Sequence, residues 1–266
     1  MEQPALPQAG RSTDSVQGHW LLARLGKRVL RPGGKELTLR LLDAARPANV
    51  DVVEFAPGLG ITAGWLLERG VATYRGVDAD ADAAARVSAA VGDRGTCTVA
   101  EAANTGLESA SADLVVGEAM LTMQTDRGKG AIIAEAARLL RPGGRYAIHE
   151  LALTPDDVAQ DVQDEVRKAL ATTIRVNARP LTLAEWTALL DAHGFEVEWT
   201  STSPMALLEM RRNLADEGFA RTARIVGNVI RDSDARRRVL AMRSVFRRYQ
   251  ANLAGIAIVA TLKEKP

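Results

Sequence analysis

Three features near the start of the chain could together bind a nucleotide. The short apolar run VVEF carries the carboxylate Glu54, and the glycine-rich turn Ala56–Gly60 follows it directly. A second apolar run ends at Asp78. Glycines let the backbone approach a ligand closely, and an acid at the end of the next strand accepts the hydroxyls of a ribose. The spacing therefore predicts a nucleotide pocket at the ends of two neighbouring strands.

Further candidates for chemistry follow at the ends of later apolar runs. Glu118 and His149 each end a run of strand type, on the expected ligand edge of the sheet. Histidine is the usual general base near neutral pH, and successive strand residues face opposite sides, so only one of His149 and Glu150 should face the pocket. Glu118 and His149 are thus the candidate catalytic bases. A loop-capping carboxylate and a buried structural histidine remain the alternatives.

The elements that must position these residues alternate along the chain. Apolar runs at 49–55, 72–77, 96–100, 113–118 and 145–151 alternate with helical segments, which predicts a parallel sheet with helices on both faces. Two further strands are expected at 195–203 and 255–264. Helical segments are expected at 16–45 and as insertions at about 152–181 and 204–250.

At this point the chain resembles the class I S-adenosylmethionine-dependent methyltransferases, over about 50–151 and 182–264. Glu54 stands at the acid that ends the family's first strand, and Gly58 and Gly60 stand at the last two glycines of its Gly-x-Gly-x-Gly turn. The first glycine is replaced by Ala56, and Pro57 stiffens the turn. In the family these glycines approach the methionine part of the cofactor.

Three further matches extend the resemblance. Asp78, with Ala79 beside it, stands at the family's ribose-binding acid. Glu101 and Ala102 match the site that reads the adenine, and LLRPGG at 139–144 matches the family's turn into the fifth strand. The resemblance therefore implies S-adenosylmethionine as cofactor. Gly58-x-Gly60 also fits the weaker pattern of NAD enzymes, but Glu54 and LLRPGG favour the methyl donor.

The resemblance also implies the domain organisation. The expected fold is a Rossmann-like, doubly wound α/β sheet of seven strands, mostly parallel with an antiparallel last strand. Residues 1–15 are expected to be a disordered tail and 16–45 a helical cap. Residues 46–266 should form the methyltransferase domain, with the two helical insertions acting as a lid.

The sequence indicates the substrate-binding residues less clearly than the cofactor-binding ones. Arg31, in the expected cap, could hold the cofactor's carboxylate, and Met123 and His149 could contact substrate. Residues 211–248 hold eleven arginines against four acids. A solvated basic face is one interpretation; a lid whose Arg211 and Arg212 bind an anionic substrate is the other.

Composition narrows the class of partner. A net charge of +1 and 4% aromatic residues argue against nucleic acid or a membrane surface as partner. The single cysteine and the lack of a signal-type start predict a cytoplasmic protein, and the spacing of acids and histidines predicts no metal site. We expect methyl transfer to an O, N, S or C nucleophile of a small molecule. The alternatives are a non-catalytic S-adenosylmethionine-binding partner protein and an NAD-dependent oxidoreductase.

Overall fold

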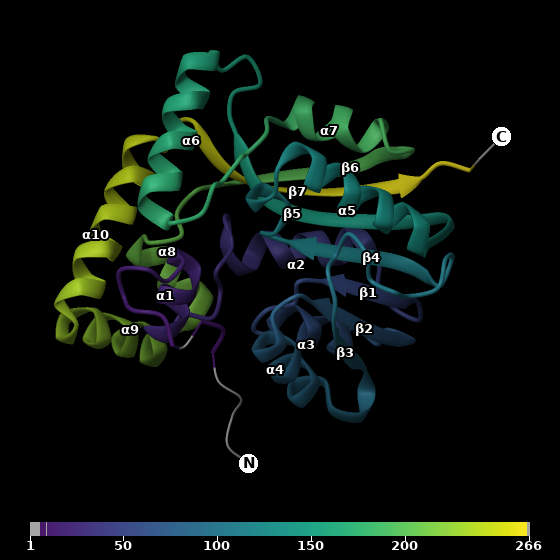
Figure 1. Ribbon diagram of the computed structural model, residues 1–266, viewed down its shortest axis with the longest axis horizontal. Helices are drawn as coiled ribbons and strands as arrows, with labels where there is room; N and C mark the ends of the chain where they lie inside the picture. Colours follow the sequence, from purple (N-terminus) through teal and green to yellow (C-terminus); the bar gives the residue numbers. More distant parts are fainter. Residues whose placement is uncertain (1–5, 9, 265–266) are drawn as a thin grey trace.

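The computed structural model describes residues 6–8 and 10–264 (Figure 1). The strands are β1 (Asp51–Phe55), β2 (Thr73–Asp78), β3 (Thr96–Val99), β4 (Ala112–Glu118), β5 (Leu140–Leu153), β6 (Phe195–Pro204) and β7 (Leu253–Leu262). The helices are α1 (Gly18–Arg24), α2 (Gly34–Ala45), α3 (Ile61–Glu68), α4 (Ala81–Val91), α5 (Asp126–Leu139), α6 (Gln160–Ile174), α7 (Leu183–Asp191), α8 (Met210–Glu217), α9 (Phe219–Arg231) and α10 (Ser233–Arg248), with 3-10 turns η1 (Gly92–Arg94) and η2 (Leu121–Met123).

The strands form one seven-stranded sheet in the order β3-β2-β1-β4-β5-β7-β6. Neighbours from β3 to β5 are parallel, whereas β7 is antiparallel to both β5 and β6. In the β4–β5 register Glu118 stands opposite His149. The predicted mixed sheet is confirmed, and its register brings the two candidate bases to the same edge.

Helices cover both faces of the sheet, and alternate residues of a strand pack into the apolar clusters on its two sides. Val53 and Phe55 of β1 pack with α5 and α7 on one face. Val52 packs with α2, α3 and α4 on the other. A strand buried on both faces needs apolar residues toward both, which β1 supplies with Val52, Val53 and Phe55.

The expected cap at 16–45 divides into two parts. In α2, Leu37, Leu41 and Leu42 are fully buried against the sheet, together with Val259 of β7. This helix is therefore one layer of the domain and not a cap, because its apolar stripe needs the sheet face for burial. Only α1 takes the capping position.

A third apolar cluster lies beyond the strand ends. It joins Leu22 of α1, Leu170 of α6 and Met242 and Phe246 of α10. In Figure 1 α1, α6, α8, α9 and α10 gather beyond one end of the sheet, on the left; we call these five helices the helical cap. The insertions expected at 152–181 and 204–250 supply four of them.

The predicted tail is partly tied to the cap. Gln8 bonds to Gln17, and Arg238 of α10 donates to the carbonyls of Thr13 and Val16. Residues 1–5 and 9 of that prediction lie outside the described residues. Among the residues that the structure describes, none of the helices has the length and apolar character needed to span a bilayer.

Candidate active site

The glycine-rich turn after β1 bends through three residues of positive φ. The φ angles are +51° at Ala56, +56° at Gly58 and +72° at Gly60, which precedes α3. Glycine adopts this conformation freely, whereas alanine is strained in it. A Cβ on Gly58 would meet no atom nearer than 3.7 Å, on Trp20, so Trp20 covers the turn without crowding it. The turn therefore has the shape that a close-lying ligand needs.

Asp78, at the end of β2, faces this turn. Its two carboxylate oxygens accept the backbone N–H groups of Gly58 and Asp80, each at 3.0 Å. Burial raises the pKa of Asp78, and the two backbone hydrogen bonds oppose that rise. Each oxygen keeps a lone pair for a further donor. The carboxylate is thus fixed in place and able to accept a pair of ligand hydroxyls.

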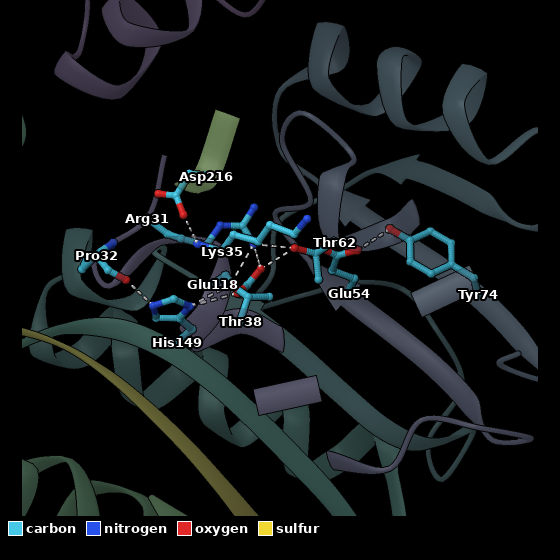
Figure 2. Close-up of polar contacts among 10 residues, drawn as sticks. All are labelled: Arg31, Pro32, Lys35, Thr38, Glu54, Thr62, Tyr74, Glu118, His149 and Asp216. Atoms are coloured by element: carbon cyan, nitrogen blue, oxygen red, sulfur yellow. Dashed lines mark hydrogen bonds and ion pairs between the residues drawn. The ribbon is translucent and has the colours of Figure 1, made fainter. Parts of the chain in front are cut away.

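Glu54 lies in β1, an interior strand of the sheet, and is almost fully buried. The hydroxyl of Tyr74 donates to its Oε2 at 2.7 Å (Figure 2). Burial raises the pKa of Glu54 to about 8, although the hydrogen bond from Tyr74 lowers it. Glu54 therefore holds a proton at neutral pH, which keeps an uncompensated charge out of the protein interior.

A second polar cluster surrounds Glu118 at the end of β4 (Figure 2). Arg31 forms an ion pair with it, and Thr62 and Thr38 donate their hydroxyls to it, the latter at 2.6 Å. Burial opposes ionisation, but Arg31 and the hydrogen bonds outweigh it and lower the pKa of Glu118 to about 2. Both of its oxygens are engaged by these partners. In this structure Glu118 therefore holds Arg31, and its role as a catalytic base stays a prediction.

His149 is fully buried behind Glu118. Its Nδ1 lies 3.0 Å from Glu118 Oε1 and 3.1 Å from Thr38 Oγ1, and its Nε2 contacts the carbonyl of Pro32. A carbonyl only accepts, so Nε2 carries a hydrogen. Both ring nitrogens are occupied, and the ring does not line the cavity described below. His149 thus contacts Glu118 from behind the cavity, and its expected role as a base or substrate contact stays a prediction that this position does not favour.

The segment that carries Arg31 and Pro32 is held by tight packing. A Cβ on Gly34 would lie 2.5 Å from Asp216 of α8, and one on Gly255 of β7 would lie 2.7 Å from Pro32. These two glycines let the RPGG turn at 31–34 sit between α8 and β7. The turn thereby directs Arg31 to Glu118 and the Pro32 carbonyl to His149.

Glu150, next to His149, binds the loop that follows β4. Its carboxylate accepts the backbone N–H groups of Met120, Leu121 and Thr122 at 2.8 to 3.0 Å and the Thr122 hydroxyl at 2.7 Å. Burial raises its pKa, and these four hydrogen bonds oppose the rise. The acid fixes the loop that carries Met123, so the loop-capping role falls to Glu150 and not to Glu118.

These groups meet around one cavity of about 430 Å³. Its cofactor-side lining includes predicted residues from several segments of the chain: Arg31, Glu54, Ala56, Pro57, Gly58, Asp78, Ala79, Glu118 and Met123. The opposite wall comes from α1, α6, α10 and the segment 205–207. The structure therefore joins most of the predicted site with the inner face of the helical cap.

Some predicted residues do not line this cavity. Gly60 lies behind the turn, against α4, and Glu101 and Ala102 follow β3 outside the lining. Arg211 is exposed, and Arg212 is paired with Glu36 at 3.5 Å and with Asp216 at 3.0 Å. The arginines expected to meet an anionic substrate instead pair with local carboxylates or face solvent.

Sequence reasoning assigned no role here to three contributing side chains. Thr38, Thr62 and Tyr74 supply the hydroxyls around Glu118 and Glu54. Isolated hydroxyl residues in apolar helices and strands carry no motif.

The fold and the site together define a Rossmann-like methyltransferase. A family model described as a methyltransferase domain matches residues 53–148. A Haemophilus influenzae protein described as uncharacterized is 34% identical over 220 residues, which cover 80% of this chain and 86% of that protein. The chain therefore contains a methyltransferase domain, consistent with the class I fold, and the cofactor that this assignment supports is S-adenosylmethionine.

Two solved structures share the fold. Phosphoethanolamine N-methyltransferase 2 of Haemonchus contortus, solved with phosphomonomethylethanolamine and S-adenosylhomocysteine, is 16% identical with a TM-score of 0.70. That match covers 97% of this chain and 59% of the other, so the chain spans less than two thirds of that enzyme. A geranyl diphosphate methyltransferase, solved with its substrate and sinefungin, is 14% identical with a TM-score of 0.60, covering 84% and 75% of the two chains.

Proposed function

We propose that this protein transfers the methyl group of S-adenosylmethionine to a small molecule enclosed by the helical cap. The observation that carries the proposal is the meeting of the Gly58 turn, Asp78, Glu54 and Arg31 around one cavity. Each group fits a different part of the cofactor, and the four come from segments far apart in the sequence.

The cofactor fits because these residues keep unused hydrogen-bond donors and acceptors. Asp78 has a lone pair on each oxygen for the two ribose hydroxyls. Arg31 uses Nη1 for Glu118 and Thr62, which leaves donors on Nη2 and Nε for the cofactor's carboxylate. Glu54, on the other side of the turn, suits the ammonium group. A zwitterionic amino-acid end is thus met by one cation and one acid.

The bound cofactor supplies a methyl group on a positively charged sulfur, which a nucleophile displaces directly. The protein's part is then to align the acceptor and to exclude water. The helical cap does this, because its apolar cluster closes the cavity on the side away from the sheet. A cavity of about 430 Å³ suits a small molecule and not a protein or a nucleic acid.

Two experiments test the proposal separately: one measures cofactor binding and the other measures methyl transfer. S-adenosylhomocysteine should bind in calorimetry and NADH should not. Asp78→Ala should weaken S-adenosylhomocysteine binding by about 2 kcal/mol, the value of charged hydrogen bonds, whereas Asp82→Ala on exposed α4 should not change it. Tritiated methyl groups should enter small molecules of a cell extract. Binding without transfer would favour the non-catalytic partner protein, and NADH binding alone would contradict the assignment.

A further inference from the structure

The wall of the cavity opposite the glycine turn is apolar. It is formed by side chains from α1, the end of β5, α6, the segment after β6 and α10, among them Leu22, Leu151, Leu170, Met205, Met242 and Phe246. The same residues belong to the apolar cluster of the helical cap. A ligand that fills this half exchanges water for aliphatic and aromatic surface, which favours an apolar molecule.

The acids on this part of the lining are already satisfied. Glu150 has four hydrogen bonds to its carboxylate, and Glu118 is paired with Arg31. Arg28 also lines the cavity, but it is exposed to solvent. Within the described residues, the apolar half therefore offers no buried charge without a partner. A charged substrate group placed there would lose its hydration without compensation.

One polar ring remains on this lining. His19 of α1 faces the cavity, and within the described residues no hydrogen bond to its ring is found. Its ring centroid lies 4.8 Å from that of Trp20, and Trp20 Cη2 lies 3.7 Å from the point that a Cβ on Gly58 would occupy. The histidine is thus held beside the residue that covers the glycine turn, where the apolar half of the cavity meets the cofactor half.

Burial also sets the protonation state of this ring, because it lowers the pKa of His19 to about 4. The imidazole is therefore neutral at physiological pH, with one nitrogen that accepts and one that donates. A neutral acceptor in an apolar chamber is suited to a hydroxyl group.

We propose, on the basis of the methyl transfer proposed above, that the substrate is an uncharged, largely apolar molecule with a phenolic or enolic hydroxyl as methyl acceptor, and that His19 takes the proton of that hydroxyl. An oxygen lone pair forms the new C–O bond while the C–S bond breaks and leaves its electron pair on sulfur. The hydroxyl proton moves to the free nitrogen of His19 and then to solvent as the product leaves. The positive charge lost by sulfur appears on the imidazolium, so the net charge of the cavity does not change.

The probe for this inference is 2-naphthol, an apolar phenol whose fluorescence distinguishes the neutral molecule from the anion formed when it loses its proton in the excited state. The protein saturated with S-adenosylhomocysteine should bind 2-naphthol and give emission from the anion. His19→Gln, which accepts a hydrogen bond but not a proton, should bind it and lose that emission. His19→Phe should also bind it about tenfold more weakly, because one hydrogen bond is lost.

Matched ligands and a second histidine provide the controls. Naphthalene-2-sulfonate and 2-naphthylmethylammonium should bind at least tenfold more weakly than 2-naphthol. His193→Phe should behave as the wild type, since His193 bonds to the Leu189 carbonyl away from the cavity. Equal anion emission from wild type and His19→Phe, or tighter binding of either charged ligand, would overturn the inference.

This experiment separates the inference from the methyl-transfer proposal. Failure to bind S-adenosylhomocysteine contradicts the proposed function, whatever 2-naphthol does. Binding of S-adenosylhomocysteine without binding of 2-naphthol contradicts the inference alone. Melting temperatures of the His19 variants within a few degrees of wild type show that a lost signal comes from the ring and not from unfolding.

Discussion

Binding of the cofactor should release a proton from Glu54. The free protein holds this acid protonated at neutral pH, because burial raises its pKa to about 8. An ammonium group beside Glu54 would favour the ionised form, so the bound state should carry the carboxylate. The proton must then leave as S-adenosylhomocysteine, which has the same amino-acid end, enters the cavity.

The size of this effect follows from the pKa. At pH 7 about nine in ten molecules carry the proton, so binding should release about 0.9 proton per site. With a pKa of about 8, the affinity should fall about fivefold from pH 8 to pH 7 and about ninefold from pH 7 to pH 6, roughly 50-fold in all, because ionising Glu54 takes more work the further the pH lies below its pKa.

Calorimetry in two buffers of different ionisation enthalpy measures both quantities at pH 6, 7 and 8. Glu54→Gln should release no proton and bind with an affinity that is nearly constant over this range. Tyr74→Phe should move the wild-type curve to higher pH, since the Tyr74 hydrogen bond lowers the pKa of Glu54. Wild-type binding without proton release, at constant affinity from pH 6 to 8, would refute the reasoning.

Three further predictions concern stability, each measured as the free energy of unfolding in denaturant. Glu118→Gln should cost about 3 kcal/mol, because it leaves the mostly buried guanidinium of Arg31 without its counter-charge; an unchanged value would contradict the ion pair. The free energy of unfolding should fall as pH rises from about 4.5 to 8, because Glu54 ionises in the unfolded chain but stays protonated in the fold; Glu54→Gln should reduce this slope, and an identical slope would contradict the assignment. Ala56→Gly should leave stability unchanged or raise it by up to about 1 kcal/mol, because φ there is +51°, whereas Gly58→Ala should lower it by about 1 to 2 kcal/mol; a loss in Ala56→Gly would show that the turn carries no strain.

The cofactor end of the site could be predicted from sequence because its geometry is local. Glu54, Gly58 and Asp78 fall at strand ends, and parallel neighbours place those ends at one edge. The hydrogen bond from Gly58 to Asp78 is a direct consequence of that register. Motif spacing and strand order were sufficient for this part.

The roles of Glu118 and His149 could not be predicted in the same way. Both lie where the sequence placed them, at paired positions of β4 and β5. Their function is decided by Arg31, Thr38 and the Pro32 carbonyl, which reach them only because α2 packs on the sheet. A pattern along one strand gives no information about partners from a distant helix.

The arginine content predicted an anionic substrate, which stays a prediction. The basic face of α8 to α10 suggested an anionic ligand, but Arg212 pairs with Asp216 one turn away, and Arg247 pairs with Glu209. Surface cations of a helix meet nearby acids first. The apolar wall, in contrast, is formed by residues from separate segments of the chain, which come together only when the cap folds.

A crystal structure of the complex with S-adenosylhomocysteine tests the central claim most directly. We predict the ribose hydroxyls on Asp78, the carboxylate on Arg31 and the ammonium beside Glu54, with the sulfur facing the apolar wall. A ligand bound outside this cavity, or one whose ribose does not contact Asp78, would contradict the account.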